Sequence, residues 1–252
     1  MTTAYAMIFI IALLGNTLGL FVVLKKSSQS TRVTNLFIAN MAVADLLLTF
    51  TVMPYQVNYY YREVSWIGGM LGNITCKAVG YLIPVSLGAT VLAMVLISFD
   101  RFYAVLYSLR EKIFRKPKIL SGTIWILSFV LMLPYPMLFQ VQFNSSQNVY
   151  QCLQVWPWED PNDPTFKETR LVLKIFHSIV FVMLYGPPFS IIIVIYFLIC
   201  RKMWRRIIPG NATDSNRAAA EKSKRKVVRL LMVVIVVVIA LCWFPNYVNL
   251  YF

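Results

Sequence analysis

The chain has 252 residues, of which 59% are hydrophobic and only 13% are charged, and its mean hydropathy is +0.66. Soluble domains carry about 25% charged residues, so this composition excludes a soluble enzyme, a disordered chain and a disulfide-stapled secreted module. The formal net charge of +14 does not indicate nucleic-acid binding, because the charges are bunched between long uncharged runs and follow membrane topology instead.

Six apolar segments are predicted as membrane helices, because each can cross a hydrocarbon core about 30 Å thick. In chain order they cover about 4–25, 33–61, 76–107, 118–140, 170–204 and 219–252. The first segment is not a cleaved signal peptide, since no basic region precedes it and its uncharged run exceeds the usual length of about 7 to 15 residues. The fold class is therefore an all-α integral membrane protein.

The basic residues predict how these spans are oriented. Nineteen of the 24 Lys and Arg residues fall in the loops that follow the first, third and fifth spans. Loops rich in Lys and Arg stay in the cytoplasm, which places the N-terminus outside. The sixth span ends at Phe252, seven residues beyond Pro245, so we expect the polypeptide to be a fragment of a longer protein.

Features on the predicted outer side agree with this topology. Cys76 and Cys152 both lie there, where disulfides persist. Asn73-Ile-Thr and Asn144-Ser-Ser have the form of glycosylation acceptors. Apolar and polar residues alternate on both sides of the turn that starts at Asn144, which predicts a β-hairpin over 139–155 that carries Cys152.

Asp45 is the only acid in the middle of a predicted span. Because a carboxylate in the membrane is costly without a partner, it indicates a functional site. The alternative is a protonated Asp that ties helices together. Asn16 and Thr90 are uncharged polar residues at similar depth, and they would complete a polar pocket for Asp45, water and a sodium ion.

Two further motifs carry information through their positions. Asp100-Arg101-Phe102 stands where the third span meets the cytoplasm, although an acid beside an Arg at a helix end is also an ordinary snorkelling pair. Cys-Trp-Phe-Pro, which ends at Pro245, lies deep in the sixth span. Pro245 kinks that helix, and Trp243 projects below the kink.

These residues occur together in the order and spacing of one family. The motifs are Gly-Asn ending at Asn16, Asn-Met-Ala-Val-Ala-Asp ending at Asp45, Trp66, Cys76, Asp-Arg-Phe, Trp125, Cys152, Pro188 with Tyr196, and Cys-Trp-Phe-Pro. The chain resembles a rhodopsin-like (class A) G-protein-coupled receptor over almost its whole length. The resemblance implies a seven-helix bundle, of which six helices are present and the seventh is missing.

The resemblance also implies roles for individual residues. Cys76 and Cys152 would form the outer disulfide, and Asp45 and Thr90 would hold an inhibitory sodium ion. Activation would involve the residues Asp100, Arg101, Phe102, Leu109, Tyr196, Pro188, Val91, Ile239, Trp243 and Pro245. Among them, Trp243 is the toggle beneath the ligand and Arg101 meets the G protein. Ile239 replaces the Phe that is usual between ligand and cytoplasm, so the packing there departs from the family pattern.

The absence of an acidic side chain at one position of the third span predicts the class of ligand. Amine receptors of this family place an Asp on the third helix where this chain has Ile83, so an amine would find no counter-ion. The hairpin-like outer loop and Pro54 resemble neuropeptide receptors, and an open hairpin suits an extended peptide. The expected pocket contains Gln56, Ile83, Leu87, His177, Val180, Trp243, Asn246 and Tyr247. For His177, a packing role at a helix end is favoured over a ligand contact.

We therefore expect a non-enzymatic plasma-membrane receptor, activated by a peptide and signalling through heterotrimeric G proteins. The basic segment 222–229 suits both anionic lipids and the G protein, and no nucleic-acid partner is expected. Alternatives are a truncated six-span partner that does not signal and a receptor for a lipid or another non-amine ligand. A transporter is disfavoured because the sequence shows no internal repeat. A membrane enzyme is disfavoured because the chain has a single His and a single acid at mid-membrane depth, in different spans.

Overall fold

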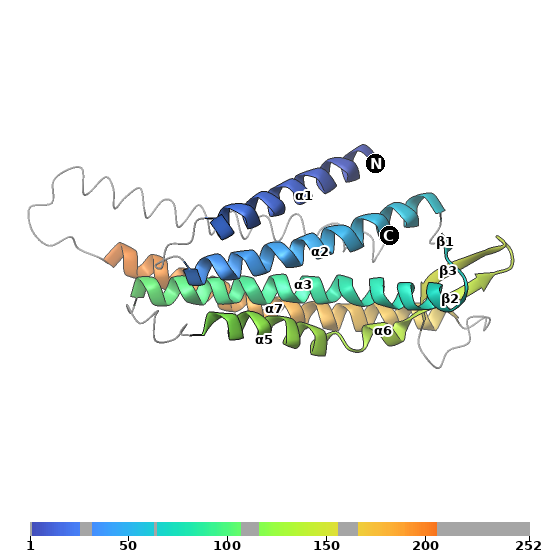
Figure 1. The fold of residues 1–252 in the computed structure, drawn as a ribbon. Coiled ribbons are helices and arrows are strands. Elements are labelled where there is room, and N and C mark those ends of the chain that lie inside the picture. The colour runs from blue at the N-terminus through green and yellow to red at the C-terminus, as the bar shows by residue number, and fades with distance from the viewer. Residues whose placement is uncertain (1, 26–31, 63–64, 107–115, 156–165, 206–252) are drawn as a thin grey trace, which may run out of the picture.

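The computed structural model describes residues 2–25, 32–62, 65–106, 116–155 and 166–205. This part of the chain contains five helices that are long and apolar enough to cross a membrane. The predicted sixth span, 219–252, lies outside the described residues. Long helices run side by side, and a small β-sheet extends from one end of the bundle (Figure 1).

The helical boundaries follow the apolar segments with two shifts. The helices are α1 (Thr2–Lys25), α2 (Arg32–Arg62), α3 (Gly69–Leu106), α5 (Pro117–Leu131), α6 (Tyr135–Leu138) and α7 (Phe166–Arg205). The third helix begins at Gly69 rather than at residue 76, so Asn73 is part of the helix and not of the preceding loop. The segment predicted as one span over 118–140 is divided into α5, the short α6 and the start of a strand.

Pro134 explains the division of the fourth span. Proline has no N–H to continue the helical ladder and clashes with the carbonyl four residues before it. The N–H of Leu133 donates to the carbonyl O of Val130 at 3.3 Å instead of to Phe129. The hydroxyl of Tyr81 on α3 donates to the carbonyl O of Phe129 at 2.7 Å, so this carbonyl is satisfied where lipid offers no donor.

Replacing Tyr81 by Phe is therefore expected to destabilise the protein by about 1–2 kcal/mol, because the Phe129 carbonyl loses its donor at membrane depth. Thermal unfolding of the purified protein in detergent measures this loss. The matched control is Tyr150→Phe on β3, an exposed tyrosine, which leaves the bond between α3 and α5 intact. An unchanged melting temperature for Tyr81→Phe would contradict the role of this bond.

The sheet confirms the predicted hairpin and adds one strand to it. Strands β2 (Phe139–Asn144) and β3 (Val149–Gln154) pair antiparallel, with Val141 opposite Cys152. Strand β1 (Ser65–Trp66) pairs antiparallel with β3, so the order is β1-β3-β2. The central strand β3 thus carries the cysteine and connects the hairpin to the loop between α2 and α3.

Three buried clusters hold the helices together at successive depths. The outer cluster joins α3 and α6 to the hairpin and consists of Cys76, Val85, Met132, Tyr135, Leu138, Phe139 and Cys152. The middle cluster contains three alanines and Ile124, and such small residues allow helices to approach closely. The inner cluster centres on Tyr196 and three isoleucines of α7, packed against α3.

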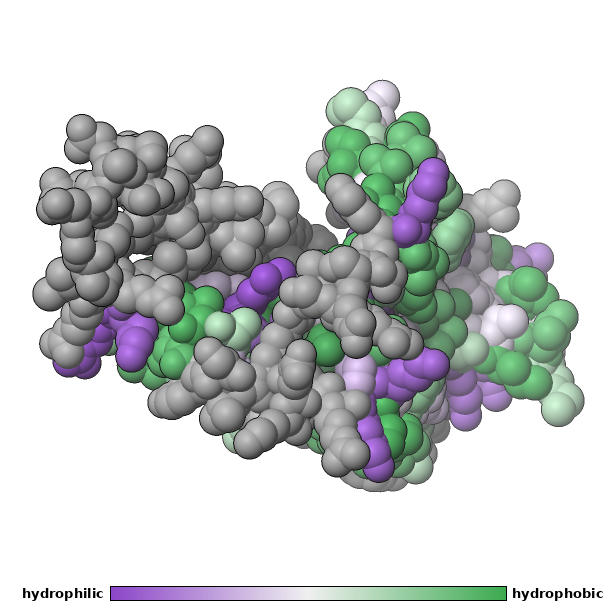
Figure 2. Space-filling model, turned by 60° about the vertical axis from the view of Figure 1, so that its left-hand side comes forward, coloured by the Kyte–Doolittle hydropathy of each residue, from purple (hydrophilic) through white to green (hydrophobic). Residues whose placement is uncertain are grey.

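The surface of the helices is apolar, as a bilayer requires. Apolar side chains, drawn in green, cover much of the described helical surface in Figure 2. Helix α1 shows this most clearly, since none of its most apolar window is buried and Ile11 is 71% exposed. It packs on α2, where the rings of Phe9 and Phe50 meet edge to face with centroids 6.1 Å apart.

Candidate functional site

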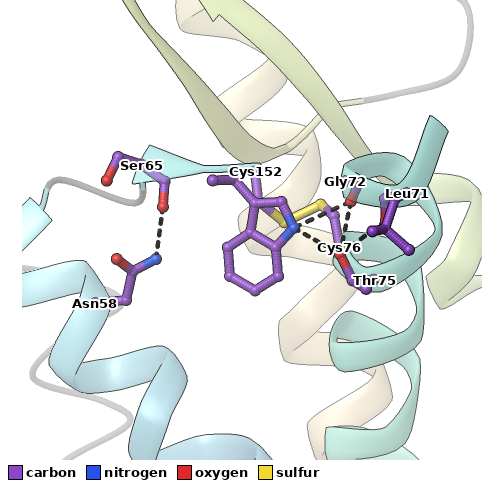
Figure 3. Close-up of a disulfide and its surroundings, with 8 residues drawn as sticks. Asn58, Ser65, Leu71, Gly72, Thr75, Cys76 and Cys152 are labelled. Atoms are coloured by element: carbon purple, nitrogen blue, oxygen red, sulfur yellow. Dashed lines mark hydrogen bonds between the residues drawn. A yellow bond between two sulfur atoms is a disulfide. The ribbon is translucent and has the colours of Figure 1, made fainter. Parts of the chain in front are cut away.

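The expected disulfide is present at the hairpin end of the bundle (Figure 3). It joins Cys76 on α3 to Cys152 on β3, and both residues are almost completely buried. Beside it, the indole N–H of Trp66 donates to the carbonyl O of Gly72 and to the hydroxyl of Thr75, each at 3.0 Å. These contacts position the sheet over the outer end of α3.

His177 connects α7 to the sheet and to α6. Its Nε2 lies 3.0 Å from the side-chain oxygen of Gln154 on β3, and its Nδ1 lies 3.4 Å from the hydroxyl of Tyr135. Because an amide oxygen only accepts, Nε2 carries the hydrogen and Nδ1 accepts from Tyr135. The structure thus gives His177 partners within the protein, at the end of the bundle where the ligand is expected.

The other described pocket residues are distributed around this end of the bundle. Ile83 and Leu87 are one turn apart on α3, so both lie on the same helix face, and both are partly buried. Val180 packs against the outer cluster, and Gln56 is a partly buried residue of α2. The remaining members, Trp243, Asn246 and Tyr247, lie outside the described residues.

The middle of the bundle brings Asp45 and Thr90 together. The hydroxyl of Thr90 on α3 donates to the Oδ1 atom of Asp45 on α2 at 2.8 Å. The amide of Asn16, expected in the same pocket, instead donates to the carbonyl O of Ala12 within α1 at 3.0 Å. The structure therefore places two of the three predicted residues in contact.

A second polar contact at this level joins α2 to α5. The indole N–H of Trp125 donates to the side-chain oxygen of Asn40 at 2.7 Å. The Nδ2 atom of Asn40 and the hydroxyls of Ser121 and Ser128 on α5 are buried without a hydrogen-bond partner. Buried polar groups of this kind are commonly satisfied by ordered water.

At the end of the bundle opposite the sheet, the Asp-Arg-Phe motif separates into a buried acid and an exposed base. Asp100 is 0% exposed and accepts a hydrogen bond of 2.5 Å from the hydroxyl of Thr34 on α2. Arg101 is exposed, whereas Phe102 packs against the inner cluster. Tyr196 on α7 is a buried member of the same inner cluster.

The structure also describes two further residues that were expected to take part in activation. Val91 on α3 is 2% exposed, and Pro188 is a partly buried residue within α7. Leu109, Ile239 and Pro245 lie outside the described residues. The described part of the chain therefore links the outer end to Arg101 through α3 and α7, which pack against each other in the inner cluster.

Replacing Thr34 by Val is expected to destabilise the protein by about 1–3 kcal/mol, because the buried carboxylate of Asp100 loses a donor. Thermal unfolding measures the effect. Thr123→Val is the matched control, since Thr123 bonds only within the exposed face of α5 and its loss is expected to stay within about 0.5 kcal/mol. Equal losses for the two variants would contradict a special role for Thr34.

Four partners of the predicted site residues were not anticipated from the sequence. They are Thr34, Asn40, Tyr135 and Gln154. Thr34 and Asn40 are polar residues in an apolar span, which is a weak signal of an interhelical hydrogen bond. Gln154 and Tyr135 carried no such signal, because their partner on α7 lies more than 20 residues further along the chain.

Comparison with known proteins agrees with this arrangement. Residues 15–252 match the family model described as 7 transmembrane receptor (rhodopsin family). The chain is 31% identical to neuropeptide FF receptor 1 of Rattus norvegicus over 223 residues, which is 84% of this chain and 48% of the relative. It is also 31% identical to the Homo sapiens neuropeptide FF receptor 1, covering 83% of this chain and 47% of the relative. Bombesin receptor subtype-3 of Ovis aries is 31% identical over 255 residues, or 97% of this chain and 59% of the relative.

The chain therefore belongs to the rhodopsin family of seven-transmembrane receptors, which are receptors and not enzymes. It spans about half the length of the first two curated relatives. Its five described apolar helices, its disulfide and its inner Asp-Arg-Phe motif are parts of such a multi-pass membrane bundle.

Proposed function

We propose that this protein is a plasma-membrane receptor that binds a peptide at its hairpin end and activates a heterotrimeric G protein at the opposite end. The observation that carries the proposal is the 31% identity to receptors named for neuropeptide FF and bombesin over 83–97% of this chain. The chemistry of α3 supports it, because Ile83 offers no counter-ion for an amine ligand.

The geometry of the outer end suits an extended peptide. The disulfide and Trp66 hold the sheet at the outer end of α3, and the bond between His177 and Gln154 ties β3 to α7. We infer that the ligand enters beside the sheet and contacts Ile83 and Leu87. Pairing of a peptide group with His177 would compete with Gln154 and so couple ligand binding to the position of α7.

The charges support an orientation with the hairpin outside the cell. The ends of α1, α3, α5 and α7 that lie away from the sheet are directed toward the same side of the bundle in Figure 1. They carry exposed basic residues, namely Lys25, Arg101, Lys116, Lys118, Arg201 and Lys202. A cytoplasmic location for these ends follows the positive-inside rule, and the same cations would attract anionic lipid headgroups. The basic segment 222–229 lies outside the described residues.

The test of the proposed function is peptide binding and G-protein activation in membranes of cells that express the protein. Neuropeptide FF and bombesin are the first probes, followed by a library of amidated peptides. We expect a peptide to bind and to stimulate nucleotide exchange, and Arg101→Ala to remove the exchange while binding remains. Leu133→Ala, on the lipid-facing surface of the described bundle, is the matched control and is expected to retain both.

Other outcomes distinguish the alternatives. Peptide binding without nucleotide exchange in any G-protein background would favour a non-signalling partner. Activation by lipids and by no peptide would replace the peptide with a lipid ligand.

We also propose that Asp45 and Thr90 bind a sodium ion. Sodium prefers oxygen ligands, as other hard cations do, and the carboxylate and hydroxyl of this pair lie within 2.8 Å of each other. One charged carboxylate suits a monovalent ion, and within the described residues no cluster of three acidic, His or Cys side chains would hold a multivalent metal. Bound sodium would neutralise the partly buried carboxylate and stabilise the inactive bundle.

Sodium chloride is therefore expected to raise the melting temperature of the protein above its value in choline chloride of equal ionic strength. The reason is that an ion bound to the folded state stabilises that state. The difference is expected to disappear in Asp45→Asn, which lacks the charge. Thermal unfolding in the two salts measures it. An equal sodium effect in the wild type and in Asp45→Asn would place the ion elsewhere.

A further inference from the structure

The two sequons near the outer end have different local structures. Asn144 is the last residue of β2 and begins the exposed turn that leads into β3. Its side-chain oxygen accepts hydrogen bonds from the backbone N–H of Ser146 at 3.1 Å and from the Ser146 hydroxyl at 2.7 Å. The two side chains that define the sequon therefore already contact each other.

The turn holds the Asn144 amide through contacts that are local in sequence. The Nδ2 atom of Asn144 donates to the side-chain oxygen of Gln151 at 3.1 Å and more weakly to that of Gln147 at 3.4 Å. Gln151 in turn donates to Gln147 at 2.9 Å. Asn148 takes the positive φ of 56° that the turn requires, a conformation that Asn tolerates well. All of these contacts lie within residues 144–151.

Asn73 lies in a setting that separates its sequon side chains. It belongs to the second turn of α3, and residues two apart on a helix do not face each other. The hydroxyl of Thr75 is also occupied. It bonds the carbonyl oxygens of Leu71 and Gly72 and accepts the indole N–H of Trp66, all at 3.0 Å (Figure 3). The Asn73 amide therefore has no hydroxyl partner.

We propose that Asn144 carries an N-linked oligosaccharide and that Asn73 does not. The disulfide at the same end of the bundle places this end in an oxidising compartment, which is also where such glycans are attached. In the transfer, Nδ2 of Asn144 bonds to the anomeric carbon of an oligosaccharide carried on a lipid pyrophosphate. The bond from that carbon to the pyrophosphate breaks, the lipid pyrophosphate leaves, and the amide loses one proton.

The geometry of the turn accommodates the product. The modified amide retains one N–H, which suffices for the stronger bond to Gln151, and only the weaker contact with Gln147 is lost. The turn residues 145–148 are all exposed. Figure 1 shows the hairpin tip directed away from the helices, so a glycan there extends into solvent and leaves the outer end of the bundle accessible.

The test is the electrophoretic mobility of the protein made in mammalian cells, before and after treatment with a peptide amidase that removes N-linked glycans. We expect the wild type and Asn73→Gln to shift by one glycan on treatment. Ser145→Pro is expected to show no shift, because proline at the middle position destroys the sequon. This variant keeps Asn144 and Ser146, and proline suits the first central position of a turn, so the hairpin is preserved.

Each other pattern overturns the proposal. A shift that persists in Ser145→Pro and disappears in Asn73→Gln would assign the glycan to α3. A shift that is lost only in Asn211→Gln, whose sequon the sequence places in the cytoplasm, would reverse the orientation as well. A wild type without any shift would show that Asn144 is unmodified. The signalling assays on Ser145→Pro report separately on the proposed receptor function.

Discussion

Replacing Cys152 by Ala is expected to lower the free energy of unfolding by about 2–4 kcal/mol. The disulfide closes a loop across 76 residues, and its loss releases conformational freedom in the unfolded chain. It also removes the covalent bond between α3 and β3 within the outer cluster, where both cysteines are buried. We expect peptide binding to fall with stability, because the sheet is then positioned by non-covalent contacts alone, among them those of Trp66 and His177.

Thermal unfolding under non-reducing conditions, with peptide binding measured in parallel, tests this expectation. Cys200→Ala is the matched control, because Cys200 is a free thiol on α7, and we expect it to change stability by less than about 0.5 kcal/mol. The double variant Cys76→Ala/Cys152→Ala is expected to resemble either single variant, since both remove one bond. Additive losses would show that the two thiols act independently.

Replacing Gly72 by Ala is expected to destabilise the outer end by at least about 2 kcal/mol. A Cβ atom at this position would lie 1.6 Å from the carbonyl O of Ile67. Backbone cannot rotate aside as a flexible side chain can, so the first turn of α3 has to move. The carbonyl of Gly72 is the acceptor for the Trp66 indole, and the displacement therefore also weakens the attachment of β1.

The matched control for this change is Gly122→Ala on α5, where an added Cβ meets nothing within 4 Å. Alanine favours the helix over glycine by about 1 kcal/mol, so this variant is expected to be slightly more stable than the wild type. Melting temperatures and peptide affinity of both variants provide the measurement. A stabilising effect of Gly72→Ala would contradict the close approach of Ile67 to α3.

Much of the outer end could be predicted, because its signals are local. Alternating residues around Asn144-Ser-Ser-Gln-Asn predicted the hairpin, and the register of β2 with β3 confirms it. The pairing of Cys76 with Cys152 followed from the resemblance to the receptor family and is present. The sequence did not reveal β1, because two residues are too short to show an alternating pattern.

Hydropathy predicted the fourth span but not the break of its helix at Pro134. The segment 119–139 is uncharged and mostly apolar, and hydropathy does not report where backbone hydrogen bonding stops. A proline within a membrane helix is tolerated when a neighbour satisfies the freed carbonyl. Whether Tyr81 reaches Phe129 depends on how α3 packs against α5, which no local pattern encodes.

The sequence by itself determined the class of protein, the number of apolar segments in the described chain and the predicted sidedness of the loops. The class rested on the order and spacing of motifs, whereas the spans and their sidedness are properties of local composition, to which a bilayer responds one segment at a time. The tertiary structure decided which polar groups meet: Thr34 with Asp100, Gln154 with His177, and Thr75 with Trp66 rather than with Asn73. Such contacts depend on the distance and rotation between neighbouring elements, and those are set only when the helices pack.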